Sequence, residues 1–290
     1  MIDLDAIQRI LSLYEQASRQ KLNREKTSVF FSRPTPSCFK LPSRLLNDIE
    51  MMTRKFWWGQ RGDQRRIHWK KWETFCKPKA LGGMGFKDLE NFNEAMLAKQ
   101  VWRLLVDRSS LFYRVFSVKY FPSRSIFDAK VAFGSYAWQS IVKARNLVQT
   151  GLLWRVGNGK KINVYGDRWL PGEDSACILS PKNGVASNWE VAKLLATRGE
   201  GWNDELVEAL FLRFEAQRIK SIPIHVTDQK DNVTWPRCRL GAYSVKMGYQ
   251  MLCETEMKAA PSSSNADEVK RFWKRIWRLK VPNKVKVLLW

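Results

Sequence analysis

Three segments of the sequence alternate cations with aromatic side chains, a pattern typical of nucleic-acid contact. Lysine and arginine neutralise phosphate groups, and aromatic faces stack on unpaired bases. The segments cover residues 54–58, 65–72 and 270–277. The side chains expected to make this contact are Arg54, Lys55, Arg65, Arg66, Trp69, Lys70, Lys71, Lys270, Arg271, Lys274 and Arg275.

The net charge of the chain favours a polyanionic partner over a purely structural use of these residues. The 290 residues include 50 Lys and Arg against 28 Asp and Glu, a formal net charge of +22. Such a chain repels itself unless a polyanion neutralises it. The alternative is that the aromatic rings form core and the cations flank it in solvent, and the helical spacing of Trp273 and Trp277 fits that alternative. This alternative does not explain the net positive charge of the chain, so RNA or DNA is the expected partner.

The sequence offers little of what catalysis requires. Two-metal phosphoryl or nucleotidyl transfer needs carboxylates placed close together, and the chain has no Asp-Asp pair. Asp63, Asp88 and Asp167 are acids that could converge in the fold. Cys76 and His68 could form a thiol nucleophile and its base, although a small buried Cys and a hydrogen-bonded His are the commoner arrangement. We therefore expect no catalytic site.

No cofactor, metal or membrane is expected either. Gly82-Gly83-Met84-Gly85 lacks the glycine spacing of phosphate-binding loops. The five cysteines and two histidines supply no closely spaced pair for zinc. The cysteines are scattered along the sequence and odd in number, which is typical of a protein in a reducing compartment. With no signal peptide pattern and no long apolar run, an intracellular protein, nuclear or cytoplasmic, is expected.

The elements that must position the basic residues are mainly helices. Apolar spacing predicts helices at 4–17, 45–57, 91–105, 110–118, 136–149, 189–196, 204–212 and 270–279, and a short strand at 26–32. Turn residues predict two β-hairpins, one at 154–165 around Gly157-Asn158-Gly159-Lys160 and one at 233–243. The expected fold class is α+β, mainly helical, with short helices and two β-hairpins.

Several longer segments resemble a known family. They are SCFKLP (37–42), FWWG (56–59), IHWKKWETFCKPKALGGMGFKDLENFNEAMLAKQVWRLL (67–105), KYFP (119–122), SYAWQSI (135–141), GLLWRVGNGKKINVYGDRWLP (151–171) and GAYSVKMGY (241–249). Together they resemble the C-terminal half of plant LINE-type, non-LTR retrotransposon reverse transcriptases. Residues 13–32 resemble the stretch that follows the family's Tyr-x-Asp-Asp catalytic turn. That turn is absent here, so the resemblance implies no complete polymerase palm and no catalytic residue.

The resemblance also implies a truncated and internally deleted chain. The family has a long stretch where this sequence has only residues 33–36, which suggests an internal deletion or a mispredicted splice. FWKRIWRLKVPNKVKVLLW (272–290) resembles the start of the family's reverse-transcriptase zinc-binding region, whose Cys and His ligands would follow residue 290.

Composition and resemblance together suggest five regions. Residues 1–33 would be a remnant of the end of the palm region, and 34–172 a basic helical region that follows the palm and ends in a β-hairpin. A small α+β region would occupy 173–260. A linker at 261–267 would lead to the truncated start of the zinc-binding region at 268–290.

The function expected from the sequence is nucleic-acid binding by a catalytically inactive fragment of a retrotransposon reverse transcriptase. One alternative is an active polymerase or RNase H-type nuclease subunit that a partner chain completes. Another is a non-functional pseudogene product.

Overall fold

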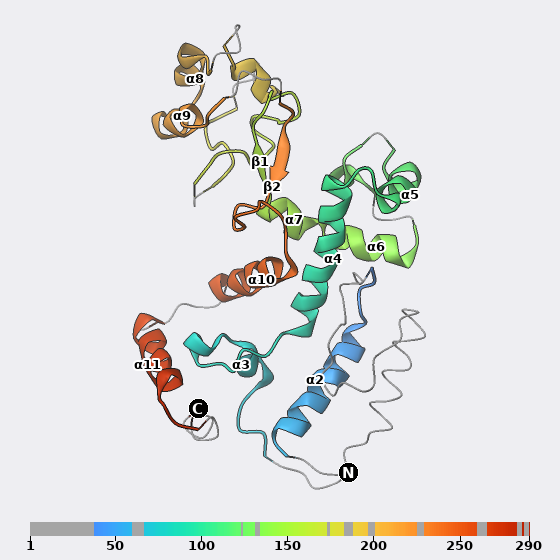
Figure 1. Cartoon of the computed structure of the whole chain (residues 1–290), viewed down its shortest axis with the longest axis vertical. Coiled ribbons are helices and arrows are strands. Elements are labelled where there is room, and N and C mark those ends of the chain that lie inside the picture. Colours follow the sequence, from blue (N-terminus) through green and yellow to red (C-terminus); the bar gives the residue numbers. More distant parts are fainter. Residues whose placement is uncertain are drawn as a thin grey trace. The chain divides into compact units, whose positions relative to one another are not determined.

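The chain is mainly helical with one small antiparallel sheet (Figure 1). The fold class predicted from the sequence, mainly helical α+β, is therefore confirmed. The computed structural model describes residues 38–59, 67–122, 124–130, 134–172, 175–182, 188–196, 201–224, 229–259, 266–282, 286 and 290. The helix predicted at 4–17, the strand at 26–32 and the palm remnant at 1–33 lie outside these residues.

The helices follow the apolar spacing of the sequence, and short polar side chains begin several of them. Ser110 Oγ accepts a hydrogen bond from Tyr113 N at 3.2 Å, and Asp88 Oδ1 accepts one from Asn91 N at 2.8 Å. The helices are α2 (Ser43–Trp57), α3 (Trp72–Cys76), η1 (Lys79–Leu81), α4 (Leu89–Val106), α5 (Leu111–Tyr120), η2 (Ile126–Asp128), α6 (Tyr136–Lys143), α7 (Arg145–Gly151), η3 (Val191–Leu194), α8 (Asp204–Leu210), α9 (Arg213–Lys220), α10 (Val245–Ala259) and α11 (Ala266–Arg278).

Two predicted helices have a different form, and several helices, among them α3, α9 and α10, were not predicted. The helix expected at 136–149 is interrupted at Ala144 and becomes α6 and α7, and the one expected at 189–196 is the 3-10 helix η3. Helix α10, one of those not predicted, contains Gly248. A Cβ at this position would lie only 1.8 Å from the Tyr243 hydroxyl. Glycine is therefore needed for a close approach and does not interrupt the helix.

The two predicted hairpins are wrong, because each region contributes one strand to a shared sheet. Strand β1 (Leu153–Arg155) pairs antiparallel with β2 (Asn232–Thr234), in the register Leu153 to Thr234. Residues 162–164 pair instead with the segment before η3, where Val164 N donates to Trp189 O at 2.9 Å. The predicted turn near Gly241 does form, and Trp235 N donates to Gly241 O at 2.7 Å.

A buried carboxylate explains why the loop after β1 does not close a hairpin. Asp231 Oδ1 accepts hydrogen bonds from Gly157 N and Gly159 N, both at 2.8 Å, and Oδ2 accepts one from Lys161 N at 2.9 Å. The N–H groups of this loop therefore surround the carboxylate and do not pair with a facing strand. Gly159 has φ +69°, a conformation that favours glycine.

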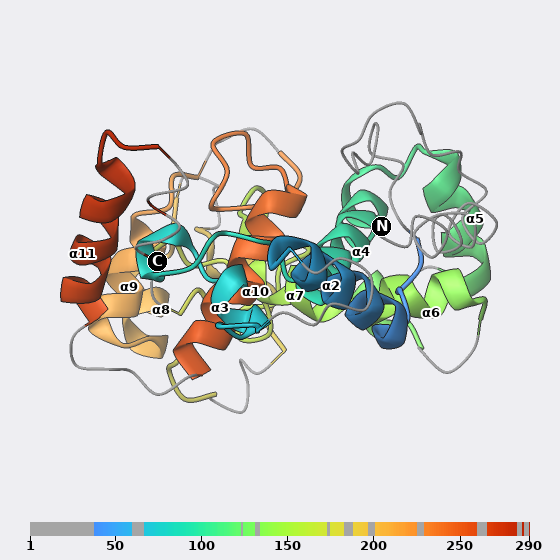
Figure 2. The same cartoon turned by 90° about the horizontal axis from the view of Figure 1, so that it is seen from below.

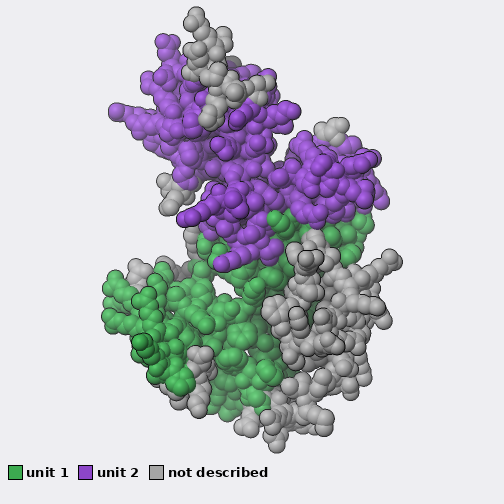
Figure 3. All heavy atoms as spheres, viewed as in Figure 1, with its two compact units in different colours: residues 1–100, 131–141, 249–290 green, residues 101–130, 142–248 purple. Residues whose placement is uncertain are grey.

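The chain divides into two compact units, each assembled from segments that are distant in sequence (Figure 3). Unit 1 contains 1–100, 131–141 and 249–290, and unit 2 contains 101–130 and 142–248. The five sequence regions stay a prediction. Of the linker expected at 261–267, residues 261–265 lie outside the described part, and α11 begins at Ala266.

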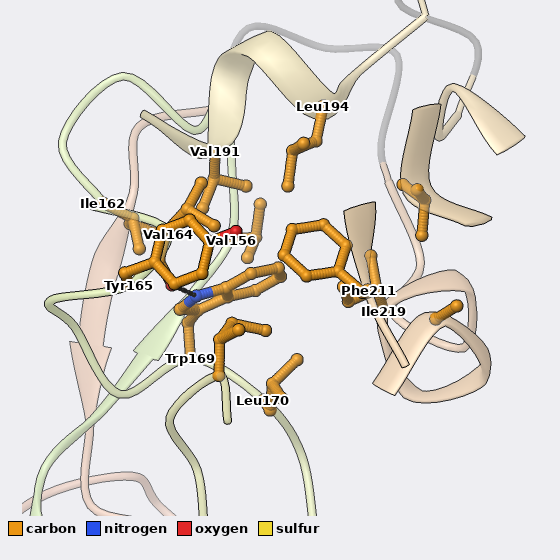
Figure 4. Packing of buried hydrophobic residues seen from close by; sticks show 13 residues of the cluster. Val156, Ile162, Val164, Tyr165, Trp169, Leu170, Val191, Leu194, Phe211 and Ile219 are labelled. Atoms are coloured by element: carbon orange, nitrogen blue, oxygen red, sulfur yellow. Dashed lines mark hydrogen bonds between the residues drawn. The ribbon is translucent and has the colours of Figure 1, made fainter. Parts of the chain in front are cut away.

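Unit 2 has a core centred on Trp169 (Figure 4). The indole is 1% exposed and its Nε1 donates to Val164 O at 2.9 Å, which satisfies its polar atom within the core. Val156, Ile162, Val191 and Leu194 lie around it and tie the loop after β1 to η3. These contacts fix the backbone of the loops without using any of the predicted nucleic-acid-binding residues.

Candidate nucleic-acid interface

The predicted binding residues that the structure describes all lie in unit 1. They come from the end of α2, from the segment before α3, and from α11. Arg65 and Arg66 lie outside the described residues. Segments separated by about two hundred residues of sequence thus belong to one compact unit.

The aromatic residues of the first two segments divide into core and surface. Phe75 is fully buried, and five rings surround it with centroids 4.8–5.8 Å from its own. For these residues the core interpretation of the sequence pattern is right. Trp69 is different, because 74% of it is exposed. The rings around Phe75 are those of Trp57, Trp58, Trp72, Phe86 and Trp290.

The cations beside this aromatic core are mostly exposed. Lys55 is exposed in the last turn of α2, where a positive charge favours the helix C-terminus. Arg54 is half-buried, and its Nε has no hydrogen-bond partner among the described residues. Lys70 and Lys71 are both exposed, next to Trp69. Exposed cations next to an exposed indole offer contacts for both phosphate and base.

Helix α11 presents cations to solvent and two tryptophans to the protein. Trp273, Ile276 and Trp277 are half-buried, and α11 packs against η1. Trp277 Nε1 donates to Lys79 O at 2.9 Å. The exposed cations of the helix are Lys270, Arg271, Lys274, Arg275 and Arg278.

Two lysines bridge the segments through cation–π contacts. Lys70 Nζ lies 5.1 Å from the centre of the Trp290 ring, and Lys79 Nζ lies 5.3 Å from that of Trp277. The C-terminal residue thereby lies beside α3, as both views show (Figure 1 and Figure 2). Sequence reasoning missed Lys79, Trp277 and Trp290 as connecting residues. The apolar stripe of 273, 276 and 277 was the available signal, since such a face needs a partner.

The acids considered for catalysis have structural partners. Asp88 begins α4, and Asp167 Oδ2 accepts from Asn163 N at 2.7 Å. Burial raises the pKa of Asp167, and the Asn163 hydrogen bond opposes that rise. Asp88 belongs to unit 1 and Asp167 to unit 2, while Asp63 lies outside the described residues. Within the described ranges, no three His, Cys, Asp or Glu side chains come together as a metal site.

Cys76 is poorly suited to be a nucleophile. Burial raises the pKa of its thiol to about 12, and the nearby Asp88 carboxylate adds to the effect. The thiol is therefore protonated at neutral pH, whereas a nucleophile must be a thiolate. His68 is exposed and stacks on Trp58 with ring centroids 6.3 Å apart. In the part of the chain that the structure describes, no helix is long and apolar enough to cross a bilayer.

Sequence comparison finds two plant relatives. The chain is 29% identical over 293 residues to a protein of Arabidopsis thaliana named "Putative ribonuclease H protein", an alignment that covers 94% of this chain and 46% of that protein. It is 39% identical over 139 residues to an uncharacterized mitochondrial protein of Arabidopsis thaliana, covering 47% of this chain and 90% of the relative. This chain belongs to the family of that mitochondrial protein. No family model and no solved structure matches it.

Membership in this plant family does not by itself assign an activity. The mitochondrial relative is uncharacterized, and the chain spans less than half the length of the relative named for ribonuclease H. What the geometry of unit 1 provides is a group of exposed cations held close to an aromatic core. Such a group can bind the phosphates of a polyanion.

Proposed function

We propose that this chain is a catalytically inactive fragment of a LINE-type retrotransposon reverse transcriptase, and that it binds RNA or DNA through unit 1. The observation that carries the proposal is the convergence of Lys70, Lys79 and α11 through aromatic contacts. Exposed cations from two distant segments, residues 70–79 and α11, are gathered in this unit. The name of the longer relative, a ribonuclease H protein, also supports contact with nucleic acid.

Phosphate contact would supply most of the affinity, and base stacking would come from Trp69. The exposed cations are positioned to neutralise phosphates, which carry no sequence information. Trp69 is 74% exposed, so a base could stack on it without disturbing the core. The expected binding is salt-dependent and weakly sequence-selective.

The proposed lack of catalysis is supported by the sequence. No Tyr-x-Asp-Asp turn and no Asp-Asp pair is present. With Mg²⁺ or Mn²⁺, a primed RNA template and deoxynucleotides, the purified chain should extend no primer. The name of the longer relative favours a nuclease subunit as the second candidate. Cleavage of a labelled RNA–DNA hybrid that is absent from a no-protein blank would favour that candidate.

The binding proposal is tested with a fluorescent single-stranded RNA titrated at several salt concentrations. The variant Lys71→Gln, Arg271→Gln, Lys274→Gln, Arg275→Gln removes four exposed cations and leaves Lys70, which packs on Trp290. Each lost phosphate contact flattens the log–log salt slope by about 0.7, so the slope should flatten by up to about 3. The same loss should occur for every RNA sequence.

A control variant removes the same charge from unit 2. Lys160→Gln, Lys182→Gln, Arg213→Gln, Lys230→Gln changes four exposed cations, all in unit 2. It should leave most of the slope intact. Equal flattening by both variants would mean that binding depends only on net charge, and the proposed interface would be wrong. Trp69→Ala should lose about 1–3 kcal/mol for single strands and nothing for duplexes.

A further inference from the structure

The C-terminal segment of unit 1 is attached to the rest of the unit by tryptophans. Trp277 Nε1 donates to Lys79 O at 2.9 Å, and Trp290 Nε1 donates to Gly82 O at 2.5 Å. The Trp290 ring also lies 4.8 Å from the Phe75 ring, centre to centre. The contacts of this segment therefore converge on α3 and the turn of η1.

The turn leaves no room for a side chain at residue 82 beside Trp273 of α11. A Cβ on Gly82 would lie 2.5 Å from Nε1 and 2.8 Å from Cε2 of Trp273. Real Cβ atoms do not approach other atoms that closely, so the Trp273 ring or the turn would have to shift. Because the Trp273 ring packs so closely on Gly82, the contact fixes where α11 lies on the turn.

The docked arrangement brings together two elements that both carry positive charge. Lys79 belongs to η1, and Lys274, Arg275 and Arg278 belong to α11, which packs against it. Like charges at short distance repel one another. The two lysines over the Trp277 and Trp290 rings are partly compensated by the ring faces. The remaining cations are exposed and available to phosphate.

We infer that docking of α11 assembles the binding surface, and that Trp273, Trp277 and Trp290 are positioning residues for it. A single nucleic-acid strand would contact the cations of α11 and those of 70–79 at the same time only in the docked state. Because phosphate contacts of both segments would then act on one strand, release of α11 should weaken binding although no cation is removed. This inference rests on the proposed nucleic-acid binding.

Two glycines of the same turn provide a matched test. Gly82 has φ +79° and Gly85 has φ +74°, so alanine is strained at both positions. A Cβ at residue 85 meets nothing within 4 Å, whereas one at residue 82 meets Trp273. The variants Gly82→Ala and Gly85→Ala thus share backbone strain and net charge, and differ in the contact with α11.

Each full-length variant is measured for hydrogen exchange in residues 266–278 and for the salt slope of single-stranded RNA binding. We expect Gly82→Ala to speed amide exchange in α11 and to flatten the slope by about 2, as if about three phosphate contacts were lost. Between 50 and 200 mM salt, the affinity would then fall about 16-fold less than in the unaltered chain. Gly85→Ala should change neither measurement.

The outcomes separate this inference from the proposed function. If the unaltered chain binds and Gly82→Ala speeds exchange in α11 with an unchanged slope, docking does not assemble the surface and the inference is wrong. If Gly82→Ala leaves exchange unchanged, the contact with Trp273 does not position α11, and the inference is equally wrong. Failure of the unaltered chain to bind RNA would instead refute the proposed function.

Discussion

Replacement of Asp231 is the sharpest test of how unit 2 holds its loops. The residue is 4% exposed, and its carboxylate accepts three backbone hydrogen bonds from residues 157, 159 and 161. Asp231→Ala removes both acceptor oxygens, and with them all three hydrogen bonds, at once. Because the donors belong to a loop whose glycines approach neighbouring backbone closely, the loop has little freedom to find other acceptors.

The magnitude follows from the burial of each donor. The hydrogen bond of Gly159 is buried, and an unsatisfied buried donor costs about 1–3 kcal/mol. The bonds of Gly157 and Lys161 are part-buried, so water can replace the carboxylate at about 1 kcal/mol each. Asp231→Ala should therefore destabilise unit 2 by about 3–5 kcal/mol. Asp231→Asn keeps one acceptor oxygen and should cost about 1–3 kcal/mol.

The assay is urea unfolding followed by tryptophan fluorescence, with hydrogen exchange at residues 157–161 as a local measurement. Asp204→Asn is the control, because its side chain is 70% exposed and pairs with Lys220 at 3.3 Å. An exposed ion pair contributes at most about 1 kcal/mol. If Asp231→Ala cost no more than this control, the loop would not depend on the carboxylate, and our explanation of the missing hairpin would fail.

Two further predictions concern titratable groups of unit 1. Burial raises the pKa of Glu94, and Lys40 opposes that rise. The charged carboxylate therefore lowers the stability of the folded chain above the unfolded-state pKa of about 4.3. Glu94→Gln should raise Tm at pH 7, and this gain should disappear as the pH falls through about 4. An equal change in Tm at both pH values would contradict this. Since burial raises the pKa of Cys76 to about 12, iodoacetamide at pH 8 should label this thiol slowly in the native chain and rapidly in urea. Labelling is measured by peptide mass spectrometry, and rapid labelling of the native chain would contradict the burial of the thiol.

A helix could be predicted from sequence where apolar residues at helical spacing follow directly after a capping residue. Helix α4 is an example, with Asp88 at its start and Ala95, Ala98 and Trp102 buried at helical spacing. Helix α10 could not be recognised in the same way, because the close contact between Gly248 and Tyr243 is a tertiary feature. A glycine that breaks a helix and one that permits close packing look identical in sequence.

The sheet and the interface depend on partners that are distant in sequence. The turn at Gly157-Asn158-Gly159 has the composition of a hairpin, but the buried carboxylate that its N–H groups bind is Asp231, more than seventy residues away. Likewise, the basic residues of the candidate interface were identified from sequence, and the tryptophan contacts that gather them were not. Composition indicates which side chains can bind phosphate, whereas only the fold determines which of them act together.

The opposing forces on α11 lead to a last prediction about salt. Repulsion between cations of α11 and those near η1 opposes docking, and added salt screens it within about 10 Å at 0.1 M. Apolar packing of Trp273, Trp277 and Trp290 is not weakened by such salt. In the free chain, amide exchange in α11 should therefore slow between 50 and 300 mM NaCl, while RNA affinity falls over the same range. Exchange that instead accelerates with salt would show that attraction between charges holds α11, and the tryptophans would lose the positioning role assigned to them.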